Sequence, residues 1–229
     1  MKNGHTTRQK APAGRYALLD ELRGLDLVSM MLYHACWDMM FLSGFCAPFG
    51  RHMLRRGVTV FAAGALVTAV TLVFMPGNRV IFGVLTFLGT AMLLTGVLEP
   101  LLKKVMPAVG LAVSAVLFAV CYPVGLGWVG LGGWKLMLPQ SLYANYFTAF
   151  FGFYPDWFYS TDYFGLLPWL FLFWAGYYLH KAVGRRRMEP LRRSVCPALG
   201  WMGRHSLLLY LLHQPVIYGV LSAAAVLFA

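Results

Sequence analysis

The stretch GVTVFAAGALVTAVTLVFM, residues 57–75, contains no charged side chain over about the length that an α-helix needs to cross a bilayer. Comparable apolar runs recur along the chain, separated by short polar or basic segments. Backbone polar groups inside a bilayer must be satisfied internally, so runs of this kind form helices. The sequence therefore predicts an all-α, polytopic bundle of transmembrane helices.

The composition supports a membrane protein. The 229 residues are 59% hydrophobic and 12% charged, with a mean hydropathy of +0.65, whereas soluble domains carry about 25% charged residues. The net charge of +11 does not predict a nucleic-acid partner, because the basic residues cluster in short loops that suit anionic lipid headgroups. The four cysteines have no CxxC spacing, so we expect neither a metal nor a disulfide framework.

Six spans are expected, and one domain, residues 17–229, contains them all. Residues 1–16 form a basic tail that we expect to be disordered. The connection 126–161 is rich in glycine and aromatic residues and is typical of an interfacial or re-entrant segment. The expected spans are 24–46, 57–75, 80–101, 107–125, 163–182 and 204–228.

The distribution of basic residues predicts the orientation. If each segment after residue 51 crosses once, the basic loops 51–56, 103–104 and 181–193 fall on one side, which the excess of Lys and Arg predicts to be cytoplasmic. The basic tail prefers that side too, yet only one crossing separates it from Arg51. Two full spans with a turn need about 40 residues, so residues 24–50 are too short for them. Either the N-terminus lies outside, or this region is a reduced helical hairpin.

Arg23 and His34 stand out within the first apolar region, LDELRGLDLVSMMLYHACWD, residues 19–38. Eleven residues are close to three helical turns, so the two side chains project from one face, about 16 Å apart along the axis. Ionisable groups in a membrane helix are costly and usually line a functional cavity. The chain contains no GxSxG, Walker A, Rossmann or HExxH motif, which leaves hydrolase, NTPase, dinucleotide and zinc-protease functions without support.

The chain resembles the bacterial branch of the heparan-alpha-glucosaminide N-acetyltransferase catalytic-domain family. The resemblance is carried in family order by residues 19–38 together with FLSGFCAPFGRHMLRRG (41–57), RVIFGVLTFLG (79–89), DYFGLLPWLFLFWAG (162–176) and GRHSLLLYLLHQPV (203–216).

The resemblance implies an internal deletion near residue 40. Family members carry a loop and most of a second helix between the segments that correspond to 19–38 and 41–57, where this chain runs straight on. The charge distribution points to the same place. The resemblance also implies a histidine at the position of Thr86 in many members.

The resemblance implies acetyl-CoA as the acyl donor and an acyl transfer in which His34 is the catalytic base. Asp38, four residues later, would orient the imidazole, and Arg23 would contact the phosphates of acyl-CoA. Each residue has a structural alternative. His34 would be hydrogen-bonded within the bundle, Asp38 would lie at the interface, and Arg23 would be a snorkelling anchor.

The other candidate site residues lie later in the chain. His213 and Gln214 precede Pro215 in the last apolar run, and they form either a helix–helix hydrogen bond or a wall of the site. Asp162 either caps the fifth helix or, with Trp169, belongs to the site wall.

An aromatic group in the long connection has two interpretations. It consists of Trp128, Trp134, Trp157 and Tyr159. These side chains form an interfacial belt or stack on a sugar.

The resulting hypothesis is a multi-pass membrane acyltransferase. It moves an acetyl or acyl group from acyl-CoA to an amino sugar or other glycan acceptor across the membrane, and the deletion leaves its activity in question. Membrane lipids are further partners, no metal is expected, and a homodimer is one option for the oligomeric state. The alternative is a non-enzymatic membrane protein, either a small permease or a structural bundle.

Overall fold

The computed structural model describes residues 37–189 and 196–228. The chain divides into two units, Met1–Met39 and Met40–Ala229, and the account below concerns the second. Arg23, His34 and the predicted tail 1–16 lie outside the described residues.

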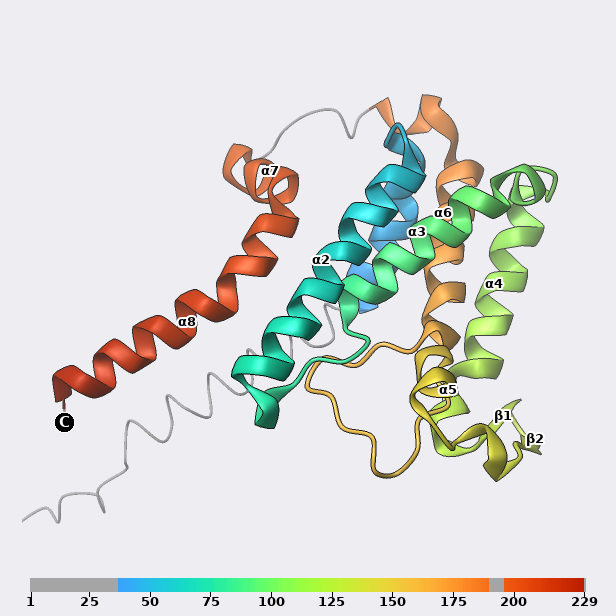
Figure 1. Cartoon of the computed structure of the whole chain (residues 1–229). Helices are drawn as coiled ribbons and strands as arrows, with labels where there is room; N and C mark the ends of the chain where they lie inside the picture. The colour runs from blue at the N-terminus through green and yellow to red at the C-terminus, as the bar shows by residue number, and fades with distance from the viewer. Residues whose placement is uncertain (1–36, 190–195, 229) are drawn as a thin grey trace, which may run out of the picture. The chain divides into compact units, whose positions relative to one another are not determined.

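The second unit is mostly helical, and Figure 1 shows its elements. Residues 37–46 form a helix. The longer elements that follow are α2 (Met53–Phe74), α3 (Val84–Leu102), α4 (Pro107–Cys121), α6 (Leu166–Arg187), α7 (Pro197–Arg204) and α8 (Ser206–Phe228), and α5 (Tyr146–Phe151) is a short helix. The strands β1 (Trp128–Leu131) and β2 (Trp134–Met137) form one antiparallel hairpin.

The helical fold class is confirmed, and the span count stays a prediction. Among the described residues, three segments are long and apolar enough to cross a membrane: Met53–Phe74, Val84–Leu102 and Pro107–Leu126. The helix expected over 163–182 begins later, at Leu166, and the element extends to Arg187 with non-helical backbone at Leu167 and Gly184. The residues just before Leu166 pair instead with the extended segment that precedes α3.

Glycines let α2 and α3 approach closely. A side chain on Gly64 would place its Cβ atom 2.6 Å from the backbone nitrogen of Thr86, and one on Gly89 would lie 2.5 Å from that of Phe61. Close contacts through small residues are typical of helices that associate in membranes. Lipid is as apolar as the helices, so the hydrophobic effect does not bring them together and close packing does.

A partly buried polar contact joins α3 to α6. Trp174 Nε1 donates a hydrogen bond to Thr95 Oγ1 at 2.9 Å, and Thr95 in turn donates to the carbonyl oxygen of Ala91. Thr95 is completely buried. Because an unpaired indole N–H would be costly in this environment, the contact fixes the register of the two helices.

The basic segments after residue 51 meet at one end of the unit. The carbonyl oxygen of Leu102, at the last residue of α3, accepts hydrogen bonds from Tyr178 and Lys181 of α6. Lys103 and Lys104 follow directly. At the same end of α6, His180 Nδ1 lies 2.8 Å from the carbonyl oxygen of Phe45, close to the start of α2 and its arginines. The orientation expected from the charge distribution stays a prediction.

The long connection between α4 and α6 is an aromatic layer at the other end. The ring of Phe158 lies against those of Phe82, Tyr146 and Tyr163, at centroid distances of 6.4, 5.9 and 5.0 Å. The Tyr143 hydroxyl donates to the carbonyl oxygen of Val124. Burial raises the pKa of this phenol, so it stays protonated and able to donate.

Candidate functional site

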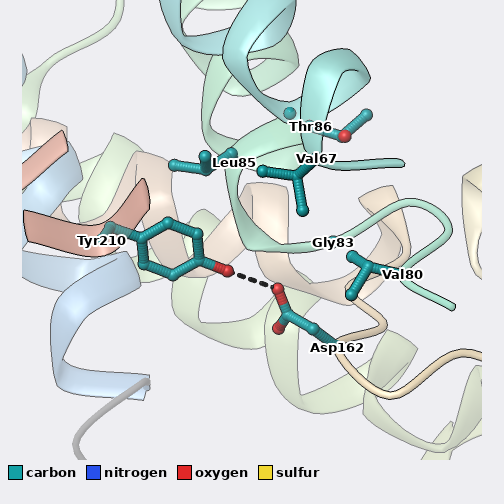
Figure 2. Close-up of a pocket in the computed structure, with 8 residues that line it drawn as sticks. Val67, Val80, Gly83, Leu85, Thr86, Asp162 and Tyr210 are labelled. Carbon is teal, nitrogen blue, oxygen red and sulfur yellow. Dashed lines mark hydrogen bonds between the residues drawn. The ribbon is translucent and has the colours of Figure 1, made fainter. Parts of the chain in front are cut away.

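Asp162 is the point at which three distant parts of the chain meet. Its Oδ2 atom accepts a hydrogen bond from the backbone N–H of Val84, the first residue of α3, at 3.1 Å. The same atom accepts a second hydrogen bond from the hydroxyl of Tyr210 in α8, at 2.7 Å (Figure 2). Asp162 therefore satisfies a free amide at a helix N-terminus, where negative charge is favoured. It caps α3 and not the helix that follows it in the sequence.

Two extended segments hold Asp162 in place. Residues 79–84 run beside residues 159–164, and the backbone nitrogens of Thr161 and Phe164 donate to the carbonyl oxygens of Arg79 and Phe82. Side chains add to this pairing, because the nitrogen of Ile81 donates to the hydroxyl of Ser160. The pairing explains why α6 begins only at Leu166.

The backbone bends sharply at Phe82, just before α3 begins. Its φ angle is +54°, a left-handed conformation that is unusual for a bulky residue and that costs energy unless the surroundings impose it. Here the Phe82 carbonyl is fixed by Phe164, and its ring packs on Phe150 at a centroid distance of 5.4 Å. The bend aims the Val84 amide at Asp162. Strained positions of this kind cluster at functional sites.

A small pocket lies beside the Asp162–Tyr210 hydrogen bond (Figure 2). Its atoms surround about 150 Å³ of space that is partly open to solvent, but no water-sized sphere fits inside, so a ligand enters only if the walls move apart. Its lining residues are Gly64, Val67, Val80, Gly83, Leu85, Thr86, Asp162 and Tyr210.

The lining contains one predicted site residue and two further polar residues. Asp162 was predicted as a cap or as part of the site wall. Tyr210 was not singled out, although it lies three residues before His213 in the stretch 203–216 that carries the resemblance. Thr86 is buried in the pocket wall, at the position where the resemblance implies a histidine.

The remaining candidates are placed elsewhere or are not described. His213 is exposed, with its ring 5.2 Å from that of Tyr210. Trp169 packs its ring on Phe118 of α4 at 5.9 Å. Asp38 is exposed in the helix 37–46 and belongs to the first unit. The side chain of Gln214 lies outside the described residues.

Metal ligands are not grouped in the part of the chain that the structure describes. No set of three or more His, Cys, Asp or Glu side chains there is close enough to hold an ion. The polar chemistry of the pocket is therefore that of one carboxylate, one phenol and one threonine hydroxyl.

The long apolar helices indicate a helical membrane protein. At one end it has a small polar site, where paired segments hold the Asp162 carboxylate against the N-terminus of α3. The heparan-alpha-glucosaminide N-acetyltransferase catalytic domain matches residues 40–215, and the chain belongs to this family. The resemblance drawn from the sequence is confirmed over this range, whereas residues 19–38 lie outside the match. No curated protein and no solved structure matches the chain.

Proposed function

We propose that this protein is a membrane acetyltransferase that moves an acetyl or acyl group from acyl-CoA to an amino sugar or another glycan acceptor. One observation carries the proposal beyond family membership. Three of the stretches that carry the family resemblance, 79–89, 162–176 and 203–216, converge on the pocket through Thr86, Asp162 and Tyr210. Residues that are far apart in the sequence are thus gathered around one polar site.

Asp162 is the group that we assign to the acceptor. Both of its hydrogen bonds go to Oδ2, and among the described residues Oδ1 has no partner. A carboxylate oxygen at a helix N-terminus is a strong acceptor for an N–H or O–H group. Asp162 therefore positions the attacking amine or hydroxyl and is not the base.

The base in this proposal is His34. As the acceptor nitrogen or oxygen attacks the thioester carbonyl, the imidazole takes its proton, the new C–N or C–O bond forms, and the C–S bond breaks. The proton then returns to the departing CoA thiolate. Asp38 orients the ring, and Arg23 binds the CoA phosphates. His213, Gln214 and Trp169 belong to the wall of a wider site.

The membrane setting follows from the charges. We place the protein in a bacterial inner membrane as a multi-pass protein, with the end formed by Leu102, Tyr178 and Lys181 on the cytoplasmic side. CoA would then arrive at the basic end, and the Asp162 pocket would face the acceptor from the opposite side.

We propose that the deletion expected near residue 40 limits turnover. The family match begins at that residue, and the helix 37–46 continues through it without a break. We propose that the missing part of the second helix leaves a protein that inserts and binds but transfers poorly, and that a complete second helix inserted after Met40 raises the rate.

The test measures transfer of labelled acetyl groups from acetyl-CoA to glucosamine in membranes that contain the chain with the completed helix. Asp162→Asn is compared with Asp156→Asn, an exposed acid in the same connection. We expect Asp162→Asn and His34→Ala to abolish transfer and Asp156→Asn to retain it. Equal transfer by His34→Ala and the unaltered protein would remove the base assignment. No transfer even with the completed helix would favour the non-enzymatic alternative.

A further inference from the structure

The β1–β2 hairpin is an apolar surface that the pocket and its chemistry do not use. It follows α4 directly, because the apolar segment Pro107–Leu126 ends two residues before Trp128. Its strands pair antiparallel with Trp128 opposite Met137 and Leu131 opposite Trp134. Side chains that face each other across an antiparallel pair lie on the same side of the sheet, so the register divides the hairpin into two faces.

The two faces differ in polarity. One face carries Val129, Leu131, Trp134 and Leu136, all apolar, and the last three are 55%, 59% and 52% exposed. The opposite face carries Trp128, Met137 and Lys135, so it is partly apolar as well but is the face that holds the charge. The Lys135 ammonium group lies 4.6 Å from the centre of the Trp128 ring. Lys135 is the only charged residue between Lys104 and Asp156.

We propose that the hairpin is a lipid-interface anchor, lying in the boundary between headgroups and acyl chains with its Leu131–Trp134–Leu136 face toward the hydrocarbon. Bulk water does not suit this face, because an isolated two-stranded hairpin is marginal in water and an uncharged apolar edge strand invites aggregation. The hydrocarbon core does not suit it either, because the open edges of a two-stranded sheet leave backbone groups unpaired. The interface satisfies both requirements.

The position of the hairpin in the sequence also supports a location at the lipid interface. The twenty residues of Pro107–Leu126, counted at about 1.5 Å each, cover the roughly 30 Å of a hydrocarbon core. The hairpin thus begins where the core ends. Exposed side chains of α4, including Val109, Val113 and Val116, continue the apolar surface up to the hairpin. Tryptophan is enriched at this depth, and the single lysine reaches outward to the headgroups.

The experiment uses the full chain with its four cysteines replaced by alanine, reconstituted in vesicles of phosphatidylethanolamine and phosphatidylglycerol. A single cysteine carrying a nitroxide label is placed at Leu136 or at its neighbour Lys135, which lie on opposite faces. Val73, an exposed residue near the end of the apolar helix α2, is the lipid reference, and Asn78 in the adjacent turn is the aqueous reference. Collision of the label with oxygen reports lipid, and collision with a nickel chelate reports water.

The expected result is an oxygen-to-nickel collision ratio at Leu136 several-fold above that at Lys135 and between the values for Val73 and Asn78. A ratio at Leu136 equal to that at Asn78 would overturn the proposal, since the face would then be in water. Strong dipolar broadening between labels on two copies would also overturn it, because a second chain would then cover the face. Unchanged elution and melting of the labelled proteins show that neither result comes from misfolding.

Discussion

The hydrogen bond between Asp162 and Tyr210 allows a quantitative test of the site. Replacing Tyr210 with phenylalanine removes one hydroxyl and leaves the ring in place. Replacing Asp162 with alanine removes the acceptor for both Tyr210 and the Val84 amide. Because the two changes share one bond, their effects on the free energy of unfolding should not add.

The magnitude follows from the charge and the location of the bond. A hydrogen bond to a charged group contributes about 1.5–3 kcal/mol in soluble proteins, whereas polar contacts between membrane helices average about 0.6 kcal/mol and reach about 1.7 kcal/mol. Asp162 is half-buried, and the 2.7 Å bond is short, as charge-assisted bonds are. We therefore expect a coupling energy of about 1 kcal/mol, within the range for membrane helices. Asp162→Ala alone should cost about 2–3 kcal/mol, since it also frees a helix amide.

The assay is reversible unfolding in mixed micelles of the unaltered protein, both single variants and the double variant. A coupling energy below about 0.3 kcal/mol, the usual error of additivity, would show that the bond does not join α8 to the start of α3. Asp156→Asn is the matched control, because this exposed acid lies in the same connection, and it should leave the stability unchanged.

Three further predictions follow from the packing and the charges. Thr95→Val leaves the half-buried indole N–H of Trp174 without its acceptor and should lower the free energy of unfolding by about 1–3 kcal/mol, whereas Trp174→Phe in the same background should recover part of that loss. Gly64→Leu forces α2 away from α3 and should destabilise by about 1–3 kcal/mol in the same unfolding assay, and an unchanged midpoint would contradict the close approach. Single cysteines at Lys104 and Asn78 should react with an impermeant maleimide from opposite sides of a sealed vesicle, and labelling of both from one side would refute the crossing of α3.

The helical fold class could be predicted from the sequence because it depends on local patterns. An uncharged run such as residues 57–75 needs no partner to be recognised as a helix. The structure extends that helix to Met53, since its first turn carries basic residues that a hydropathy pattern excludes. The hairpin also had a local signal, Gly132-Gly133 between apolar residues, which the aromatic composition of the connection obscured.

The site could be predicted only in part because its contacts are long-range. The capping rule that was applied to Asp162 considers only the residues that follow it, whereas the amide that it caps belongs to Val84, about eighty residues earlier. Tyr210 lies in a run of leucines, where a tyrosine is an ordinary interfacial residue. Its role depends on the hydroxyl meeting a carboxylate from another segment, and no local pattern encodes that meeting.

The Asp162–Tyr210 hydrogen bond stabilises the site. Under the proposed function it also restricts the space for the acceptor. The pocket has no room for a water-sized sphere and must widen to admit a sugar. Tyr210 is the lining residue that α8 contributes. An acceptor bound to Oδ1 shares the carboxylate with the Tyr210 hydroxyl on Oδ2, which draws negative charge away from the acceptor. Tyr210→Phe should therefore lower the melting temperature while it strengthens acceptor binding. A bond with a purely structural role would lower both, so the opposite signs distinguish a site from a simple helix contact.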